Sequence, residues 1–199
     1  MEATEKSKLL KNNIANIISL LIVPLSLIAF YYLYIKEVFL AFLFISLCFY
    51  LDTIDGYISR KLKIESELGR SIDSFCDFII YLIFPIYFIF QYLSFNLLMT
   101  FLISVLVLIT GIIKLNRFNS EGFIIVNGEK YYRGMMVPYV LLCVAICYII
   151  YSNFFGGIIY LIPFVMMAIS ILMVSSIKFK KTNNYLWYLL MVLILWMIY

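Results

Sequence analysis

The four aspartates of this chain are the residues whose type and spacing most clearly point to chemistry. All of them fall between residues 52 and 77. Asp52 and Asp55 are three residues apart and Asp73 and Asp77 are four apart, so each pair lies on one face of a helix. Four carboxylates brought together repel one another, and a cation has to hold them. Oxygen ligands in a chain without histidine favour a hard ion, so the pattern predicts two divalent cations, Mg²⁺ or Mn²⁺.

Two glycines accompany the aspartates, Gly56 directly after the first pair and Gly69 before the second. A missing side chain lets a phosphate or a backbone segment approach closely, which suits a bound diphosphate. The alternative is that the aspartates pair with nearby lysines and arginines as an ordinary rim and that Gly56 is a helix-packing glycine. Two pairs at helical spacing, each with a glycine, favour the functional interpretation.

The elements that must position these residues are membrane helices. Of the 199 residues 65% are apolar, more than a soluble chain of this length could bury. About 20 apolar residues cross the bilayer core as a helix. The candidate spans are 14–34, 38–58, 72–93, 95–115, 135–152, 157–175 and the shorter 185–199.

We therefore expect an all-α integral membrane protein with six to seven transmembrane helices and a cytoplasmic N-terminus. Residues 1–199 form one domain in this interpretation, with a juxtamembrane segment at 1–13 and an extra C-terminal helix at 185–199. The protein is expected in the cell membrane, with the aspartates facing the cytoplasm.

The orientation follows from the basic residues, which concentrate in cytoplasmic loops. With the N-terminus inside, 14 of the 15 basic residues lie on the cytoplasmic side and only Lys36 lies outside. These short basic clusters between apolar runs also argue against nucleic acid as a partner. The absence of histidine excludes catalysis by histidine and Ser-His triads. The four cysteines lie in apolar runs and are interpreted as packing residues.

Read in full, the aspartate segment resembles the motif of the CDP-alcohol phosphatidyltransferases, D-x2-D-G-x2-A-R-x7–8-G-x3-D-x3-D. Seven of its eight defined positions agree, and Ser59 stands in place of the usual Ala. The resemblance implies that Asp52, Asp55, Asp73 and Asp77 hold two divalent ions. It also implies a CDP site formed by Asp52, Gly56, Ser59, Arg60 and Gly69. Asp77 would be the catalytic base that deprotonates the acceptor hydroxyl.

Later stretches resemble one branch of that family, the CDP-diacylglycerol–serine O-phosphatidyltransferases. Residues 114–119, KLNRFN, are similar to that branch's R-L-x-R/K-F-N, and residues 134–138, GMMVP, to its G-L/M-P-x-P. Residues 172–181, LMVSSIKFKK, resemble the end of its last common span. The chain departs from the branch at Lys114 and Met136, and at three large residues after the last aspartate, Ile80, Leu82 and Phe84.

These resemblances imply transfer of a phosphatidyl group from CDP-diacylglycerol or a related CDP-lipid to serine, with release of CMP. Lys114, Arg117 and Asn119 are candidates for binding the acceptor or a phosphate, although Lys114 could equally anchor its helix at the membrane surface. The family also implies a homodimer. The alternatives are another acceptor (glycerol 3-phosphate, inositol phosphate or choline) and, more remotely, a divalent-cation transporter.

Overall fold

The computed structural model describes residues 20–62, 67–94, 96–153, 156–181 and 184–198. The chain divides into two compact units, Met1–Ile80 and Tyr81–Tyr199, and each is described by itself. The predicted segment 1–13 and the first residues of the predicted span 14–34 lie outside the described residues.

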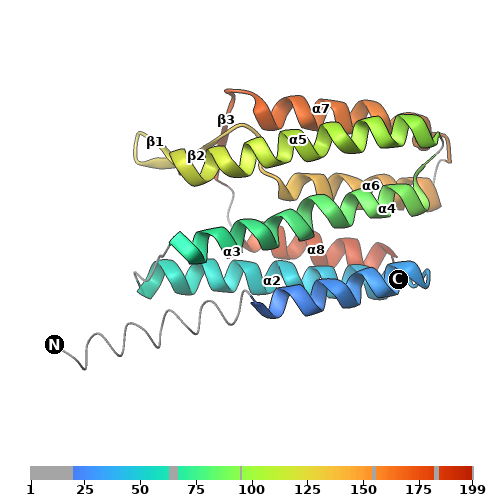
Figure 1. Ribbon diagram of the computed structural model, residues 1–199, viewed down its shortest axis with the longest axis horizontal. Coiled ribbons are helices and arrows are strands. Elements are labelled where there is room, and N and C mark those ends of the chain that lie inside the picture. The colour runs from blue at the N-terminus through green and yellow to red at the C-terminus, as the bar shows by residue number, and fades with distance from the viewer. Residues whose placement is uncertain (1–19, 63–66, 95, 154–155, 182–183, 199) are drawn as a thin grey trace. The chain divides into compact units, whose positions relative to one another are not determined.

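The first unit contains a helix from Leu20 to Tyr34, α2 (Val38–Leu62) and α3 (Glu67–Phe78) (Figure 1). The turn before α2 places Lys36 at φ 68°. The first helix packs against α2: its Tyr32 stacks on Phe44 of α2, with ring centroids 5.3 Å apart. Further along the same pair of helices, the Cys48 thiol donates to the Ile22 carbonyl at 3.7 Å.

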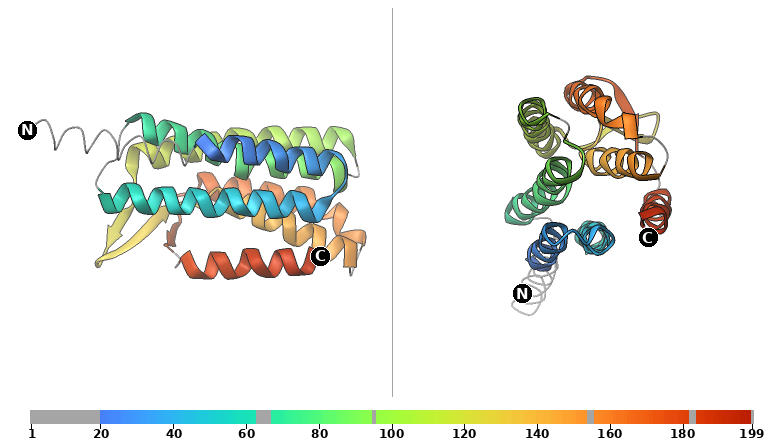
Figure 2. Two further views of the ribbon diagram at one scale, coloured as in Figure 1. Left: turned by 90° about the horizontal axis from the view of Figure 1, so that it is seen from below. Right: turned by 90° about the vertical axis from the view of Figure 1, so that its right-hand side faces the viewer.

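The second unit is built on five α-helices among the described residues: α4 (Phe84–Tyr92), α5 (Leu97–Glu121), α6 (Pro138–Asn153), α7 (Ile162–Val174) and α8 (Asn184–Ile198). A π-helix, η1 (Ile79–Ile83), leads from α3 into α4, and a 3-10 helix, η2 (Gly156–Tyr160), precedes α7. α5 packs along α7. α6 contacts α4, α7 and α8, which Figure 2 shows from two further sides.

Helix α5 shows how the sequence builds a long membrane helix. Asn96 caps its first turn, with the side-chain oxygen accepting from the Met99 N–H at 3.1 Å. Ser104 and Thr110 donate to carbonyls of the preceding turn, so both hydroxyls are satisfied within the helix itself. The helix has 25 residues, about 37 Å at 1.5 Å per residue, and exceeds the hydrocarbon thickness of about 30 Å.

A three-stranded antiparallel sheet follows α5, a feature that the sequence analysis did not predict. It consists of β1 (Ile124–Val126), β2 (Glu129–Arg133) and β3 (Lys178–Lys180), with β2 in the middle. Between β1 and β2, Asn127 and Gly128 have φ of 52° and 78°. An Asn-Gly pair between two runs rich in β-branched and aromatic residues is the sequence signal for such a hairpin.

The predicted helical membrane architecture is confirmed in outline. Three helical segments are long and apolar enough to cross a membrane, Val38–Gly56, Gly69–Tyr92 and Leu97–Glu121. The remaining predicted spans coincide with shorter apolar helices, among them Leu20–Tyr34, Pro138–Asn153 and Ile162–Val174. The number of crossings and the side of the N-terminus stay predictions.

Candidate functional site

Helix α2 carries the first pair of aspartates in its C-terminal half. Asp55 is buried, at 6% exposure, and Asp52 is half-buried. The neighbouring hydroxyl of Thr53 donates back to the Phe49 carbonyl at 2.9 Å. The helix backbone thus supplies the hydrogen-bond partner of the Thr53 hydroxyl. The two carboxylates lie within a largely apolar helix.

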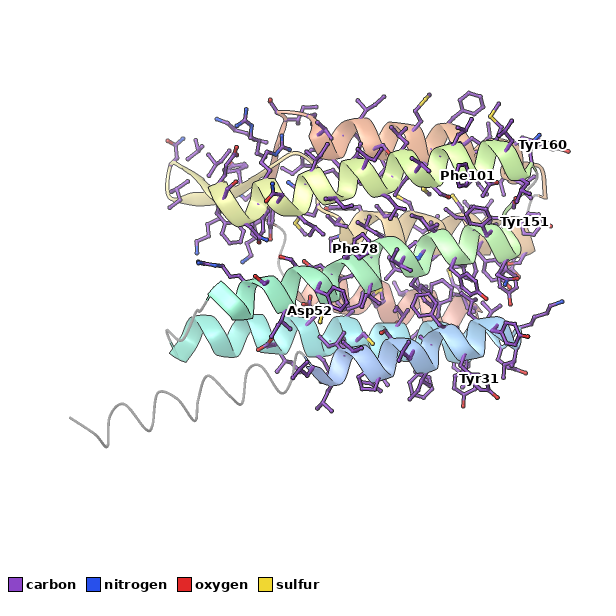
Figure 3. The ribbon with its side chains drawn as sticks, in the orientation of Figure 1. Tyr31, Asp52, Phe78, Phe101, Tyr151 and Tyr160 are labelled. Carbon is purple, nitrogen blue, oxygen red and sulfur yellow. The ribbon has the colours of Figure 1, made fainter. Side chains whose placement is uncertain are left out.

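Helix α3 carries the second pair. Asp73 and Asp77 are one turn apart and both are half-buried. Cys76 between them is fully buried, whereas Phe75 is 56% exposed. α3 therefore turns one face inward, and the aspartate pair lies at the edge of that face. Figure 3 marks Asp52 on α2 and Phe78, the residue after Asp77, on α3.

The carboxylates of the two helices come within electrostatic reach of each other. Asp77 interacts with both Asp52 and Asp73. The Cys76 thiol lies in the field of the same three carboxylates and of Cys48, one turn before Asp52 on α2. The Asp52 carboxylate on α2 thus interacts electrostatically with the Asp77 carboxylate on α3.

The residues at this place fit divalent cations by their chemistry. Three carboxylates with partial burial need positive charge nearby, and carboxylate oxygens are the ligands of Mg²⁺ and Mn²⁺. Within the described part of the chain, no three Asp, Glu or Cys side chains come close enough to share one ion. The carboxylates are therefore candidate metal ligands that interact electrostatically but are too far apart in this structure for three of them to share one ion.

The remaining predicted nucleotide-site residues flank this cluster. Gly56 is half-buried on α2, and Gly69 is half-buried in the first turn of α3. Ser59 and Arg60 belong to the end of α2, and their side chains lie outside the described part of the structure.

The predicted acceptor residues lie in the second unit, on the last turns of α5. Lys114 is 4% exposed, and its ammonium group donates to the Arg133 and Gly134 carbonyls at 2.6 and 3.1 Å. The Arg117 guanidinium donates to main-chain carbonyls of residues 133, 173, 174 and 175 at 2.8–3.2 Å. Asn119 is exposed on the same helix.

Sequence reasoning missed these main-chain partners. Arg117 and the carbonyls of α7 are 56–58 residues apart in the chain, and no local pattern links them. The nearest signal was the similarity of both stretches to one branch of a family, which does not say that the stretches touch each other.

Comparison with known proteins places the chain in a family. The sequence profile of the CDP-alcohol phosphatidyltransferase family matches residues 12–196, and that family is generally dependent on divalent cations.

Three curated relatives are similar to the chain. The archaetidylserine synthase of Methanothermobacter thermautotrophicus is 27% identical over 135 residues, 67% of this chain and 54% of that protein. The CDP-diacylglycerol–serine O-phosphatidyltransferase of Methanocaldococcus jannaschii is 29% identical over 148 residues, 72% of this chain and 65% of that protein. The protein of the same name from Bacillus subtilis is 29% identical over 160 residues, 80% of this chain and 85% of that protein. The matches thus span about half to two thirds of the archaeal relatives.

Proposed function

The chain belongs to the CDP-alcohol phosphatidyltransferase family, and from this premise we propose that it transfers a phosphatidyl group from CDP-diacylglycerol to the hydroxyl of serine, releasing CMP. The observation that carries the proposal is the electrostatic interaction of Asp77 on α3 with Asp52 on α2 and with Asp73 one turn away. The names of the three relatives, each a serine-transferring enzyme of lipid synthesis, support serine as the acceptor.

The reaction is a direct displacement at phosphorus. The serine hydroxyl oxygen attacks the phosphorus that carries the diacylglycerol, and the bond from this phosphorus to the CMP oxygen breaks. CMP leaves with the electron pair of that bond. The hydroxyl proton passes to the Asp77 carboxylate, which acts as general base.

The other residues of the cluster bind and orient. Asp52, Asp55, Asp73 and Asp77 would hold two divalent cations, Mg²⁺ or Mn²⁺, which supply positive charge to the diphosphate and its leaving oxygen. Gly56 and Gly69 leave room for the nucleotide, and Ser59 and Arg60 contribute a hydroxyl and a fixed positive charge to the CDP site. Asp55 is buried, so a bound cation would compensate the cost of burying its charge.

The site would face the cytoplasm from the cell membrane, and the active form would be a homodimer. Placement at the cytoplasmic face is supported by the distribution of basic residues, 14 of 15 of which fall on one side of the predicted topology. The donor lipid and the product are then both membrane lipids, whereas serine and CMP enter and leave through the cytoplasm.

A CMP-release screen tests the proposal. The purified protein in detergent is incubated with CDP-diacylglycerol, Mn²⁺ or Mg²⁺ and, in separate reactions, serine, glycerol 3-phosphate, inositol phosphate or choline. We expect CMP release with serine and its loss on addition of EDTA, with recovery when excess divalent cation is restored. Release with only another alcohol would replace serine as the acceptor and leave the chemistry standing. No release with any alcohol, together with Mn²⁺ flux into protein-containing liposomes, would favour a transporter instead.

A further inference from the structure

The last carbonyls of α7 need hydrogen-bond donors from outside the helix, because the final carbonyls of any helix have no partner within it. The Ser175 N–H donates to the Ile171 carbonyl at 3.0 Å. The Leu172 carbonyl accepts from the Ser175 hydroxyl at 2.8 Å and from the Met135 N–H at 3.0 Å. The next three carbonyls, those of residues 173, 174 and 175, still need donors.

One side chain from another helix supplies all three donors. Arg117 Nη2 donates to the Met173 and Ser175 carbonyls at 2.8 and 3.2 Å. Arg117 Nη1 donates to the Val174 carbonyl at 2.9 Å. A planar guanidinium can serve several carbonyls at once, which the single ammonium of lysine does less well. Its positive charge also opposes the partial negative charge at a helix C-terminus.

Gly134 completes the contact from a third segment. Its N–H donates to the Ile177 carbonyl at 2.7 Å. Its φ is +80°, and a Cβ placed there would lie 2.8 Å from Arg117 Nη2 and would clash with the Met173 carbonyl oxygen. Only glycine fits between the arginine and the end of α7.

We infer that Arg117, Gly134 and the carbonyls of Met173–Ser175 form a structural clamp that locks the end of α7 to α5, and that Arg117 is not an acceptor-binding residue. The three stretches that resemble the serine-transferring branch, 114–119, 134–138 and 172–181, all meet in this clamp. Their similarity to that branch therefore reflects a shared way of packing the end of α7 against α5, and not the recognition of serine. The inference goes beyond the proposed function and holds whichever alcohol is the acceptor.

The competing interpretation, in which Arg117 binds the acceptor, has one observation in its favour. Arg117 Nε is buried and has no hydrogen-bond partner among the described residues, so this N–H is a donor left for the carboxylate of an acceptor. The two interpretations differ in what they expect of Gly134, which has no side chain to offer a substrate but is essential to the clamp.

The test compares Arg117→Ala and Gly134→Ala, singly and combined, in the full-length protein. Apparent Tm in detergent is followed with a thiol-reactive dye, because Cys48, Cys76 and Cys147 are buried and become reactive on unfolding. Hydrogen exchange of the amides of residues 134 and 135 reports on the clamp directly. Steady-state CMP release gives kcat and the KM for the acceptor.

Two matched controls separate the clamp from general effects. Arg133→Ala removes an arginine whose side chain pairs with Glu121 at the surface, at 3.2 Å. Gly128→Ala places an alanine at nearly the same positive φ, +78°, but with nothing within 4 Å of its Cβ. Arg133→Ala should stay within about 2 °C of the parent, since surface ion pairs contribute little. Gly128→Ala should lower the apparent Tm by about 2–4 °C, the cost of a side chain at positive φ alone, because its Cβ meets no neighbour.

We expect both clamp variants to lower the apparent Tm by at least about 5 °C. Arg117→Ala removes the donors of three helix-end carbonyls, and Gly134→Ala forces a Cβ against the Met173 carbonyl oxygen and Arg117. The amides of 134 and 135 should exchange faster in both, and the double variant should be no worse than the poorer single variant. The acceptor KM should stay within about twofold in each. If neither clamp variant folds while both controls do, the clamp is supported, and Arg117→Lys then supplies the kinetic comparison.

The inference is overturned if Arg117→Ala, or Arg117→Lys, raises the acceptor KM by about tenfold or more with stability and amide exchange unchanged. It is also overturned if Gly134→Ala behaves like the Gly128→Ala control. A chain without any phosphatidyltransferase activity would remove the proposed function but leave the stability and exchange comparisons intact.

Discussion

Asp77 carries the proposed proton transfer, and its surroundings explain why its carboxylate suits that task. It lies within the field of Asp52 and Asp73 and at the edge of the buried face of α3, where water is limited. Like-charged neighbours and limited water both favour proton uptake by a carboxylate, as a general base requires.

We predict that Asp77→Asn lowers kcat for CMP release by about 10²–10⁴-fold, the usual contribution of a general base. The amide has nearly the same shape, so folding should be preserved, which size-exclusion elution and apparent Tm would verify. If the variant keeps more than about a tenth of the parent kcat, the base is another group.

The gathered carboxylates also predict an effect on stability that is separate from catalysis. In EDTA the like charges at Asp52, Asp73 and Asp77 repel one another, so Asp73→Asn should raise the apparent Tm by about 2–4 °C. With saturating Mn²⁺ the order should reverse, because the variant loses a metal ligand. An unchanged Tm in both conditions would show that Asp73 is not part of a shared cation site.

At the scale of single residues, the sequence was most informative where spacing is local. The pairs Asp52/Asp55 and Asp73/Asp77 could be placed on helix faces from their spacing alone. The role of Lys114 and Arg117 could not be read in the same way. Their hydrogen-bond partners are main-chain carbonyls on other segments, and any residue type presents such carbonyls.

Among the elements, the close approach of the segment before α4 to α5 shows how large residues are accommodated. Leu82 lies in the π-helix η1 and is fully buried. A Cβ on Gly111 would lie 2.5 Å from its Cδ1 and 2.6 Å from its Cδ2. The leucine thus occupies the space that a glycine on α5 leaves open.

We predict that Gly111→Ala destabilises the protein by about 1–3 kcal/mol through overpacking. Leu82→Ala alone should also be destabilising, because it leaves a cavity. The combined variant should cost less than the sum of the two, since each change makes room for the other. Thermal unfolding of the three variants measures this coupling, and simple additivity would contradict the packing described.

The helices could be predicted from hydropathy, because a membrane helix must be apolar over most of its length. The predicted spans 38–58, 72–93 and 95–115 coincide with α2, with the run from α3 to α4, and with α5. The sheet was missed because its strands are 3 to 5 residues long and one of the three, β3, comes from a distant segment. The π-helix was missed because it has no distinctive composition: Ile79–Ile83 is as apolar as its neighbours.

For the whole molecule, the positive-inside distribution predicts which surfaces face the cytoplasm. Lys36, at the turn before α2, is the one basic residue expected outside, and Lys130, in β2, is expected inside. We predict that a cysteine at position 36 reacts with a membrane-impermeant maleimide in intact cells, whereas one at position 130 reacts only after permeabilisation. The native cysteines provide the background, since three of the four are buried. Labelling in the reverse pattern would invert the topology.

The pairing of β2 with β3 has a consequence for how the chain is threaded through the bilayer. Tyr131 to Arg133 are hydrogen-bonded in register with Lys178 to Lys180, so both strands lie on the same side of the membrane. The polypeptide leaves β2 and returns at β3 to the same side of the membrane, so residues 134–177 cross the bilayer an even number of times. This parity is independent of any counting of charges: whichever way the molecule is inserted, a crossing by α6 requires a return crossing by α7.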